Sequence, residues 1–562
     1  MKHYQPVGMP GSLDYPDSTV GDLLAGAARR RPDRVALRDG DLVLTFAEAY
    51  DHALRVAQGL RERGVRPGEA VALHQPNSAW FTVTYYGILL AGAAVTPVNP
   101  ALPPAALRDQ LAEAGAVAAF THPATRDALD RAEVPGLRLV VEVPATECAP
   151  APEGAERSGL LLEDLFAAEP APATPVSGDD LAHLSFTGGT TGRSKAVRVL
   201  HRNVVANALQ MACWRAGALP RVDAGGGLYL EPVAEAQTPH TFPADGSTTV
   251  ALAPMFHAMG LVSQNLSTLM GTTVVVFGRF DAERYVRAVE RYRVTSVPGS
   301  PTLFHALLAL PGIEKADLTS VRVVNSGAAP IDSSTLRRLH DLFPNACVIE
   351  GYGLTEATMA LTTHPMERDG AIPVGSVGAP VFDTEIEIRG LAGGPALPPG
   401  ETGEVWARGP QITDGYQGHP ELTAEQFQGG WLRTGDLGRL DEDGWLFLVG
   451  RAKDMLIYKG YNVYPTPLED LLHQHPAVAQ AAVVGAPHPE AGEIPVAYVT
   501  VRAGHEPDAE LARALMDHVA DHVAPYQRVR EVHFLEALPV SAAGKILKTE
   551  LRRHEQPNSP SH

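Results

Sequence analysis

Residues 184–196 combine the residue types that could hold a polyphosphate. An apolar run over residues 181–186 breaks into the sequence Thr187-Gly188-Gly189-Thr190-Thr191-Gly192-Arg193-Ser194-Lys195. This change predicts a strand followed by a loop whose backbone comes close to a polar group. The glycines free backbone N–H groups to point inward, the threonines add hydroxyl donors, and the two cations add positive charge. Together these groups suit a phosphate cradle.

The loop is not a Walker A motif. The required Gly-Lys-Ser/Thr ending is absent, because Arg193 follows Gly192 and Lys195 comes two residues later. Taken alone, the pattern also fits a flexible Gly/Thr turn on the surface. The rest of the chain has to decide between the two.

The elements that must position this loop alternate between strands and helices. Apolar residues recur at three- and four-residue steps between Thr45, which can cap a helix, and Gly64, which can end it. The alternation predicts parallel sheets covered by helices on both faces. We expect strands at residues 70–73, 94–98, 116–120, 250–253, 273–277 and 321–326, and further helices at 80–90, 103–114 and 203–215.

Some segments depart from this alternation. Residues 144–156 and 169–177 are rich in proline, alanine and acidic residues, and we expect surface connections there. Residues 221–247 contain three consecutive glycines and three prolines with little periodicity, which favours a long loop or insertion. Residues 385–405 are glycine-rich with short apolar runs, which indicates a small β subdomain.

The expected fold class is α/β with two domains. A chain of 562 residues is too long for one core. We expect a large N-terminal domain, residues 1–449, made of layered α/β subdomains plus the small β subdomain. A small, mobile α+β C-terminal domain, residues 450–562, would follow. Its expected strands are at 481–484, 496–501 and 529–534, and its expected helices at 467–475 and 509–523.

Composition excludes some classes of partner. With 45% hydrophobic and 20% charged residues, the chain is ordinary for a globular protein. Its net charge of -19 argues against a nucleic-acid surface and against electrostatic attachment to anionic membranes. An acidic protein that binds a polyanion needs a locally positive loop, which the candidate cradle would supply.

Sequence features also favour a cytoplasmic location. Cys148, Cys213 and Cys347 have no metal-like spacing, which indicates a reducing compartment and no disulfide framework. The first sixteen residues lack the apolar core of a secretory signal. The most membrane-like stretch, residues 80–95, is short and interrupted by polar residues, so a buried helix is expected there.

Further motifs follow the cradle in a fixed order. They are Pro254-Met255-Phe256-His257-Ala258-Met259-Gly260, Ser326-Gly327-Ala328-Ala329-Pro330, Gly351-Tyr352-Gly353-Leu354-Thr355-Glu356, Trp431-Leu432-Arg433-Thr434-Gly435-Asp436-Leu437-Gly438, the region 450–465, and Pro539-Val540-Ser541-Ala542-Ala543-Gly544-Lys545. From about Thr45 to Leu551 the chain resembles the adenylate-forming superfamily. This superfamily contains acyl-CoA synthetases, non-ribosomal peptide synthetase adenylation domains and firefly luciferase.

The resemblance implies a two-step reaction. A carboxylic acid and MgATP would give an acyl-adenylate and pyrophosphate, and a nucleophile, usually the thiol of CoA, would then displace AMP. Two anions repel during the first step, so positive charge must lie where negative charge builds up. The implied cofactors and co-substrates are ATP, Mg²⁺ and CoA.

The resemblance also implies the nucleotide-binding residues. The cradle (Thr187, Gly188, Gly189, Thr190, Thr191, Gly192 and Lys195) would hold the phosphates. Glu356 would hold Mg²⁺, and Thr355 would add a hydroxyl at the phosphates. Tyr352, between Gly351 and Gly353, would stack on adenine. Asp436 would accept hydrogen bonds from the ribose hydroxyls, with help from Arg451.

The remaining implied roles concern the acid and the second step. Lys545 would reach between the acid and the α-phosphate during adenylation, and His257 would stand at the acyl pocket. Lys453 lies where the superfamily has its hinge. Rotation there would replace Lys545 by the loop that would line the CoA tunnel, namely Lys459, Gly460 and Tyr461.

Each of these residues also has an ordinary structural explanation. Thr355 and Glu356 could cap a helix after a glycine turn. Asp436 could be a turn aspartate. His257 could be a core histidine beside Phe256, and Lys545 a solvated lysine. The order of the motifs favours the functional interpretation.

The chain departs from the superfamily pattern at a few positions. The cradle usually ends in Pro-Lys-Gly, whereas this chain has Ser194-Lys195-Ala196, so the local backbone is expected to differ. Ile457 and Asn462 stand where several relatives carry lysine or glutamine. Acyl-CoA ligases vary there, so CoA stays the expected acceptor.

The candidate acyl pocket mixes small and apolar residues. Its expected members are His257, Met259, Gly260, Ser263, Ser300, Ser326, Gly327, Ala328, Gly353 and Leu354. This lining suits a medium or long fatty acid or an aromatic, cinnamate-like acid, and no aspartate suited to an α-amino group is evident. The alternative acceptors are a carrier-protein thiol, an amine or nitrite. A non-enzymatic nucleotide-binding protein would lack catalytic groups that this chain has, and a homodimer stays open.

Overall fold

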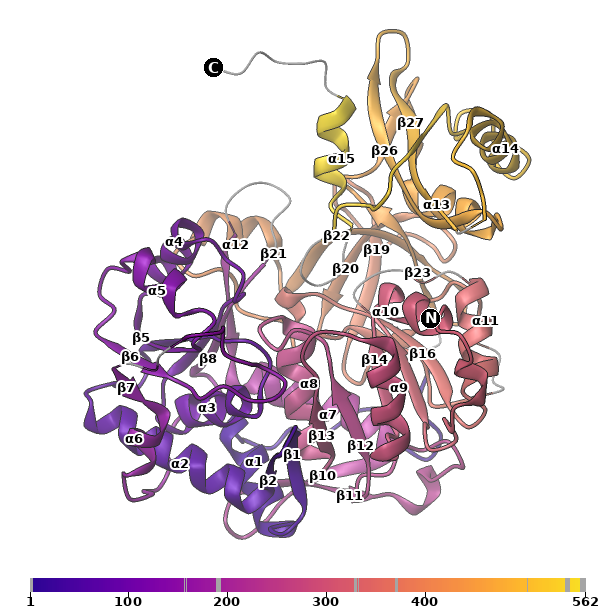
Figure 1. Ribbon diagram of the computed structural model, residues 1–562. Helices are drawn as coiled ribbons and strands as arrows, with labels where there is room; N and C mark the ends of the chain where they lie inside the picture. The colour runs from indigo at the N-terminus through magenta and orange to yellow at the C-terminus, as the bar shows by residue number, and fades with distance from the viewer. Residues whose placement is uncertain are drawn as a thin grey trace.

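The computed structural model describes residues 4–155, 157, 159–187, 194–327, 331, 333–368, 372–502, 504–540 and 546–555. These residues form a large body with a smaller C-terminal part above it (Figure 1). Helices cover mixed and parallel sheets in the body, so the expected α/β class is confirmed.

One sheet of the body carries the candidate cradle at its edge. Its strand order is β7-β6-β5-β3-β4-β8-β9. All neighbours pair in parallel except β8 and β9, which form an antiparallel hairpin. The bounds are β3 (Ala70–His74), β4 (Ala94–Pro97), β5 (Ala116–Thr121), β6 (Leu139–Glu142), β7 (Leu160–Leu161), β8 (Leu181–Phe186) and β9 (Ala196–Leu200). The tip of the β8–β9 hairpin is the glycine- and threonine-rich loop.

A second, nine-stranded sheet carries most of the other motifs. Its order is β18-β17-β16-β15-β14-β12-β13-β1-β2, parallel from β16 to β1. The bounds are β1 (Val35–Asp39), β2 (Leu42–Thr45), β12 (Thr248–Ala251), β13 (Thr273–Val276), β14 (Ser296–Gly299), β15 (Val323–Ser326), β16 (Cys347–Tyr352), β17 (Thr362–Thr363) and β18 (Ala379–Pro380).

Helices fill the space between these two sheets and cover their outer faces. One core joins both sheets through Val71 of β3, Val323 of β15 and the helices α1 (Val20–Arg30), α2 (Phe46–Glu62), α3 (Ala79–Leu90), α7 (His201–Ala216) and α8 (Ala258–Leu269). The other face of the nine-stranded sheet packs on α9 (Ala282–Arg291), α10 (Pro301–Leu308) and α11 (Ser333–Leu342), with η2 (Ile313–Lys315) between the last two. The outer face of the seven-stranded sheet packs on α4 (Pro104–Ala114) and α5 (Arg126–Ala132), and α6 (Leu162–Phe166) follows β7.

Local sequence signals explain where the first of these helices begin and end. Thr45 caps α2 through its side chain, which accepts a hydrogen bond from the Glu48 backbone N–H, and Gly64 has a φ of 83° just after the helix. Ser78 caps α3, which is buried along nearly its whole length, as expected. No helix in the described part of the chain is both long and apolar enough to cross a membrane.

Two smaller sheets follow. The expected β subdomain is an antiparallel sheet in the order β19-β20-β22-β21, with β23 paired to β22. Its bounds are β19 (Glu385–Arg389), β20 (Gly403–Arg408), β21 (Phe427–Gln428), β22 (Trp431–Leu440) and β23 (Leu446–Arg451), and α12 (Pro420–Gln426) precedes β21.

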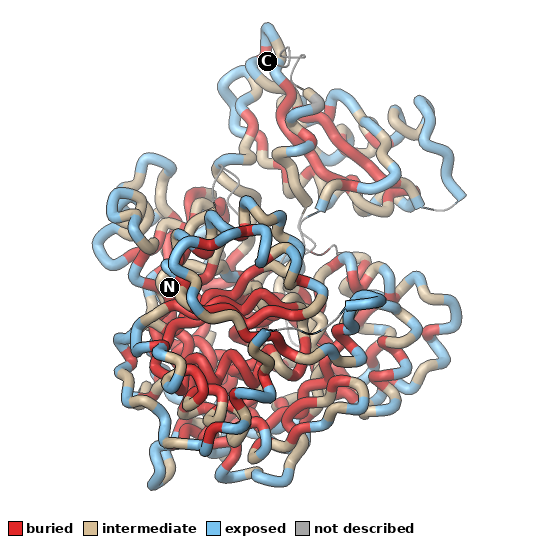
Figure 2. The backbone as a smooth tube through the Cα atoms, turned by 60° about the vertical axis from the view of Figure 1, so that its left-hand side comes forward, coloured by how far each residue is buried: buried red, intermediate tan, exposed pale blue. Residues whose placement is uncertain are grey.

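The C-terminal part has its own sheet and its own core. The order β25-β24-β27-β26, with β28 beside β27, packs against α13 and α14 through Leu468, Leu472 and Leu515. Figure 2 shows buried segments in this part separate from those of the body. The bounds are β24 (Leu456–Tyr458), β25 (Tyr461–Val463), α13 (Pro465–Gln474), β26 (Val478–His488), β27 (Gly492–Val501), α14 (Ala509–Ala520), β28 (Glu531–Phe534) and α15 (Lys548–Glu555).

The structure corrects the expectation for residues 221–247. The first half of this region completes a β-hairpin of β10 (Ala218–Val222) and β11 (Leu228–Pro232), followed by η1 (Ala234–Ala236), and only residues 237–247 form a loop. The hairpin packs on α1, where the Arg30 guanidinium lies 3.8 Å from the centre of the Tyr229 ring. Arg29 pairs with Asp223 at 3.0 Å. The glycine triplet forms the turn between the strands. The strands were not predicted because prolines are rare inside β-strands and pointed to a loop.

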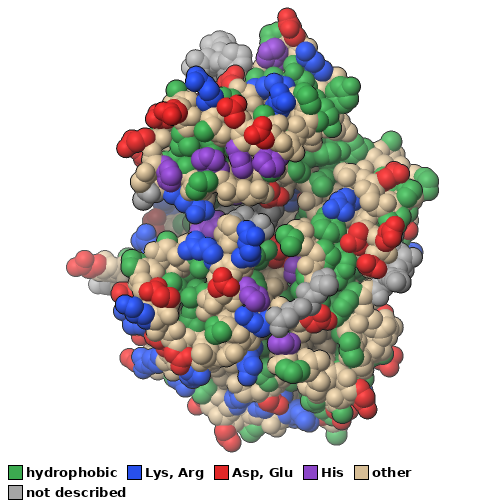
Figure 3. Space-filling view, turned by 90° about the vertical axis from the view of Figure 1, so that its right-hand side faces the viewer, with side chains coloured by type: hydrophobic (Ala, Val, Ile, Leu, Met, Phe, Trp, Pro, Cys, Tyr) green, Lys and Arg blue, Asp and Glu red, His purple; other side chains and the backbone are tan. Residues whose placement is uncertain are grey.

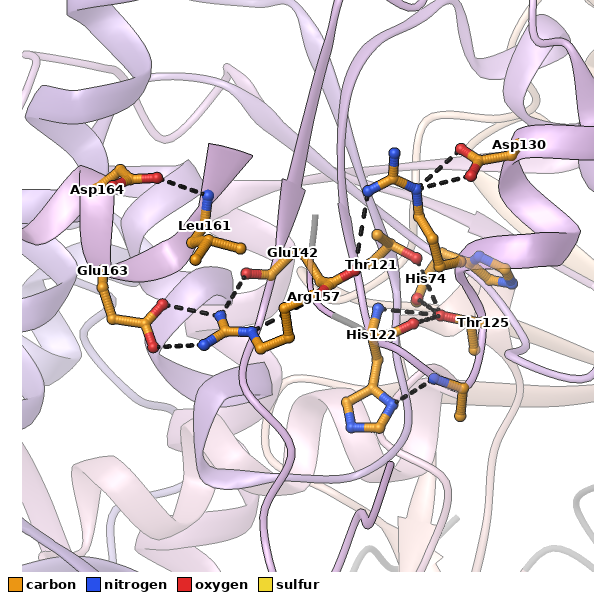
Figure 4. A network of polar contacts seen from close by, with 12 residues as sticks. His74, Thr121, His122, Thr125, Asp130, Glu142, Arg157, Leu161, Glu163 and Asp164 are labelled. Carbon is orange, nitrogen blue, oxygen red and sulfur yellow. Dashed lines mark hydrogen bonds and ion pairs between the residues drawn. The ribbon is translucent and has the colours of Figure 1, made fainter. Parts of the chain in front are cut away.

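A network of polar contacts lies at the β6–β7 end of the seven-stranded sheet (Figure 4). Glu142, at the end of β6, is 1% exposed, and its carboxylate lies 3.5 Å from Arg157 Nε and 3.8 Å from Arg126 Nη1. Arg157 also donates two hydrogen bonds of 2.8 Å to Glu163. Because its charge is compensated from two sides, the carboxylate can be buried.

Candidate active site

The candidate acyl pocket lies where three parallel strands end side by side. Gly299 of β14 pairs with Ser326 of β15, which pairs with Glu350 of β16. Ser300, Gly327 and Gly351 therefore follow at the same edge, and the Gly327 N–H donates to the Gly299 carbonyl at 3.1 Å. Loops at the carboxyl ends of parallel strands are the usual place for a ligand. Ser326 is buried, and its hydroxyl oxygen has no hydrogen-bond partner among the described residues.

The first turn of α8 lies against this edge. The Met259 sulfur lies 3.3 Å from the place where Gly327 would carry a Cβ, so these two predicted pocket residues are in contact. His257 is the N-cap residue of α8, and its carbonyl accepts from the Leu261 N–H at 2.8 Å. A Cβ on Gly260 would overlap the Pro254 carbonyl oxygen, so only glycine fits there.

Two of the other predicted pocket residues lie on neighbouring elements. Ser263, one turn further along α8, is within 3.9 Å of the Met359 sulfur. Leu354 packs on the core of the β subdomain. Ala328 lies outside the described residues, so the structure does not place it.

Tyr352, Asp436 and Arg451 form one connected group. The Tyr352 hydroxyl donates to Asp436 Oδ2 at 2.7 Å, and Arg451 Nε lies 3.1 Å from Asp436 Oδ1. The pairing of β22 with β23 places Asp436 opposite Arg451. Burial, and then the charge of Asp436, hold the pKa of Tyr352 well above its usual range, so the hydroxyl keeps its proton and remains a donor. The structure thus brings together three residues predicted from separate motifs.

The glycines on either side of Tyr352 are required by the protein itself. A Cβ on Gly353 would overlap the Met359 carbonyl, and one on Gly351 would come within 2.9 Å of the Thr362 carbonyl oxygen. The end of β16 therefore packs tightly on the segment that leads into β17.

Glu356 lies in the short helix η3 (Thr355–Ala357) beside this group. Its carboxylate accepts a hydrogen bond of 2.8 Å from the Tyr416 hydroxyl. Its backbone carbonyl accepts from both the N–H and the hydroxyl of Thr413, each at 3.0 Å. Burial raises the pKa of Glu356. Carboxylate oxygens are the ligands that Mg²⁺ prefers, and Mg²⁺ usually takes one or two of them together with phosphate oxygens and water, so the Glu356 carboxylate fits this ion.

The base of the candidate cradle is well defined. Phe186 pairs with Ala196, the Thr187 N–H donates to the Lys195 carbonyl at 3.2 Å, and the Ser194 hydroxyl donates to the Thr187 carbonyl. Lys195 is half-buried. The tip, Gly188, Gly189, Thr190, Thr191, Gly192 and Arg193, lies outside the described residues.

Ala196, which stands where the superfamily pattern has glycine, pairs with Phe186 in this hairpin. It is fully buried in the extended strand β9, which alanine adopts without strain. Its N–H donates to Glu113 Oε1 at 3.0 Å.

The predicted C-terminal residues lie in two turns that follow Arg451. Lys453 is exposed in the turn between β23 and β24. Lys459 and Gly460, with φ values of 49° and 83°, form the tight turn between β24 and β25. Tyr461 stacks on Tyr526, with ring centres 4.8 Å apart. Among the described residues, no hydrogen bond or ion pair joins this hairpin to Tyr352, Asp436 or Arg451.

Lys545 lies outside the described residues. The segments before and after it are joined, because Val540 bridges to Ile546 and the Leu547 N–H donates to the Pro539 carbonyl at 2.8 Å. Arg552 of α15 pairs with Asp454, next to Lys453, at 2.6 Å.

Sequence reasoning missed several residues that support these loops. The Asn77 side chain donates to the Ala253 carbonyl at 2.9 Å and accepts from the Met255 N–H at 2.8 Å, which ties the turn after β3 to the segment before His257. Tyr416 and Glu113 were also overlooked. The Pro-Asn-Ser turn after an expected strand was the one available signal.

Comparison with known proteins identifies the class that this fold and site define. The family described as AMP-binding enzyme matches residues 24–417, and the AMP-binding enzyme C-terminal domain matches residues 467–545. The chain belongs to the AMP-binding enzyme family, so the predicted resemblance to adenylate-forming enzymes is confirmed.

Individual relatives match along nearly the whole chain. A feruloyl-CoA synthase of Amycolatopsis sp is 34% identical, covering 95% of this chain and 98% of its own. The 4-coumarate–CoA ligase-like 3 of Oryza sativa subsp. japonica is 37% identical, covering 98% of this chain and 90% of its own. Among solved structures, the anthranilate CoA ligase AuaEII in complex with anthranoyl-AMP is similar, with a TM-score of 0.84 and 27% identity. That match covers 97% of this chain and 99% of the other.

Proposed function

We propose that this protein is an AMP-forming ligase that joins a carboxylic acid to CoA. The acid and ATP give an acyl-adenylate and pyrophosphate, and the CoA thiol then displaces AMP. The observation that carries this proposal is the similarity to CoA ligases, which extends over almost the entire chain and so includes both the N-terminal and the C-terminal motifs. The three named relatives are all CoA ligases, which favours CoA over a carrier-protein thiol, an amine or nitrite as the acceptor.

The proposed acid is aromatic, with a benzoate-like or cinnamate-like skeleton. Feruloyl, coumarate and anthranilate in the names of the relatives support this choice over a fatty acid. Met259, which lies against Gly327, supports it as well, because a thioether sulfur makes favourable contacts with an aromatic ring. His257 would stand at the end of the pocket where the carboxylate reacts.

The proposed nucleoside site is the group of Tyr352, Asp436 and Arg451. The Tyr352 ring would stack on adenine, and the Asp436 carboxylate would accept from the ribose hydroxyls. The ion pair with Arg451 and the hydrogen bond from Tyr352 orient the Asp436 carboxylate, so an acceptor is already in place before the nucleotide binds.

The proposed phosphate site is the cradle, and the proposed metal site is Glu356. The cradle residues Thr187, Gly188, Gly189, Thr190, Thr191, Gly192 and Lys195 would bind the β- and γ-phosphates, and Thr355 would contribute its hydroxyl. Glu356 would hold Mg²⁺, which when bound neutralises phosphate charge during the attack of the carboxylate. Lys195 supplies positive charge locally in a chain with a net charge of -19.

We further propose that the chain divides near Gly450 into domains 1–449 and 450–562, with Lys453 as the hinge. The separate core of the C-terminal part supports this division. Figure 3 shows a face hollowed between that part and the body, with histidine, lysine and arginine side chains around the hollow. Rotation at Lys453 would exchange Lys545 for Lys459, Gly460 and Tyr461, which would line the CoA tunnel.

We propose a cytoplasmic location, because ATP and CoA are available there and Cys148, Cys213 and Cys347 form no disulfide among the described residues. The oligomeric state is to be measured by light scattering, where a homodimer would give twice the monomer mass of 59.8 kDa.

The test is a panel of cinnamic, benzoic and fatty acids, each with ATP and Mg²⁺ and each with and without CoA. We expect AMP and a thioester to be released only when CoA is present. We also expect the cinnamic and benzoic acids to react faster than the fatty acids. A preference for fatty acids would contradict the acid assignment alone. AMP release without thioester would contradict the acceptor, and ADP formation would contradict the whole proposal.

A further inference from the structure

Residues 413–417, here called the linking segment, run between the base of the cradle and Glu356. On one side, the segment pairs with β9. Tyr416 bridges to Val197, the Gln417 N–H donates to the Ala196 carbonyl at 2.8 Å, and the Arg198 N–H donates to the Gly415 carbonyl at 2.9 Å. The backbone of the linking segment is therefore an added strand on the β8–β9 hairpin.

On its other side, the linking segment holds Glu356 at two points. Thr413 binds the Glu356 carbonyl with its N–H and its hydroxyl, and the Tyr416 hydroxyl donates to Glu356 Oε1 at 2.8 Å. Both the peptide and the carboxylate of Glu356 are thus positioned by residues whose backbone is paired to the cradle.

We propose that Tyr416 is a positioning residue that aims the Glu356 carboxylate at the cation and couples it to the phosphate cradle. The inference rests on the proposed role of Glu356 as a Mg²⁺ ligand. The Tyr416 hydroxyl donates to one carboxylate oxygen, Oε1, and this hydrogen bond restricts the rotamer of Glu356. A ligating carboxylate is usually held in this way by an outer hydrogen bond.

The ring of Tyr416 is anchored independently of its hydroxyl. The ring packs edge-to-face on Phe427, with ring centres 6.1 Å apart. The backbone N–H of Tyr416 donates to the Thr423 hydroxyl at 3.0 Å. Tyr416→Phe therefore removes the hydrogen bond to Glu356 and keeps the packing. Tyr15→Phe is a matched control, because the Tyr15 hydroxyl donates to Asp383 at 2.7 Å in another part of the protein.

The experiment measures ATP affinity by calorimetry on the full chain over a series of Mg²⁺ concentrations. Removing an outer-shell partner typically lowers metal affinity by about 10- to 100-fold, so Tyr416→Phe should raise the half-saturating Mg²⁺ concentration by about tenfold. ATP affinity without Mg²⁺ should stay unchanged, and Tyr15→Phe should match the wild type throughout.

Glu356→Gln separates the failure of this inference from failure of the proposed function. If Glu356→Gln removes the Mg²⁺ dependence but Tyr416→Phe leaves it at the wild-type value, the positioning role is overturned and the function stands. If Glu356→Gln keeps the wild-type Mg²⁺ dependence, the metal role of Glu356 and the inference both fail. If the wild-type chain does not bind ATP at all, the proposed function fails with them.

Discussion

Tyr352 and Asp436 are 84 positions apart in the sequence, yet one hydrogen bond of 2.7 Å joins their side chains. Each was predicted from its own motif, with a separate role in nucleotide binding. The bond between them depends on how β16 packs on β22, which no local pattern encodes. The structure therefore adds that the proposed adenine-stacking residue also holds the proposed ribose acceptor.

Removing this bond should weaken ATP binding without stopping the chemistry. Tyr352→Phe keeps the ring for stacking but leaves Asp436 with Arg451 alone. A hydrogen bond to a charged group contributes about 1.5–3 kcal/mol, so we expect the KM for ATP to rise by at least about tenfold with kcat changed little. Steady-state kinetics with varied ATP test this.

Tyr4→Phe is the control for this variant, since the Tyr4 hydroxyl donates to Glu367 at 2.8 Å. A Tyr352→Phe enzyme with wild-type KM for ATP would show that Asp436 needs no help from Tyr352.

Glu350 gives the protein a pH-dependent stability. Burial, and then the nearby charge of Asp470, raise the pKa of Glu350 from 4.5 to about 8. Between these two values the folded protein binds a proton that the unfolded chain lacks, so this group favours folding at low pH. Its contribution is lost as the pH rises through the folded value.

Glu350→Gln should remove this part of the pH dependence. We expect the wild type to lose more thermal stability than the variant between pH 6 and pH 8.5, as measured by the apparent melting temperature. Equal losses in the two proteins would mean that Glu350 is ionised in the folded state across this range.

At the scale of elements, the sequence predicted those with strong periodicity and clear ends. The helices α2 and α3 and the strands β3, β4 and β5 lie within one or two residues of the expected ranges. Capping by Thr45 was visible because the Thr-x-x-Glu pattern is local. The hairpin of β10 and β11 was missed, because its prolines and glycine triplet outweighed a short alternation at Leu228 and Leu230.

The missed hairpin predicts a stability effect in α1. A Cβ on Gly26 would overlap the Leu228 carbonyl oxygen of β11. Alanine would raise the intrinsic helix propensity by about 1 kcal/mol, but displacing a packed backbone typically costs about 1–3 kcal/mol. Gly26→Ala should therefore lower the melting temperature by a few degrees and leave the KM values unchanged.

Gly11→Ala is the control, because its Cβ would meet nothing closer than 3.9 Å. A Gly26→Ala protein as stable as the wild type would show that the hairpin moves away from α1 at little cost.

At the scale of the whole molecule, the order of the motifs carried most of the functional prediction. Cradle, acyl-pocket, nucleotide and C-terminal motifs are far apart in the sequence, and the described ones come from several sheets in the structure. Their order revealed the family. The supports of the site, such as Asn77, Glu113 and Tyr416, could not be predicted, because each acts through a contact made only after folding.

The proposed exchange of the C-terminal residues should separate the two half-reactions. Lys545→Ala should lower the rate of adenylate formation by at least about 100-fold. The substitution removes the cation that would stabilise the negative charge that develops when the carboxylate attacks the α-phosphate. ATP binding, and thioester formation from supplied acyl-adenylate and CoA, should stay near the wild-type values. The exposed Lys315 provides the control, Lys315→Ala.

If Lys545→Ala forms the adenylate at the normal rate, Lys545 has no role in the first step. Equal loss of both half-reactions would contradict the exchange of residues between them.

A single-turnover reaction with excess enzyme, ATP, Mg²⁺ and a cinnamic acid, first without CoA, tests whether an acyl-adenylate precedes the thioester. We expect one pyrophosphate and one enzyme-bound acyl-adenylate for each ATP consumed, and release of AMP with a CoA thioester when CoA is added. ADP and phosphate in the first stage, or a thioester formed without a preceding adenylate, would contradict this expectation.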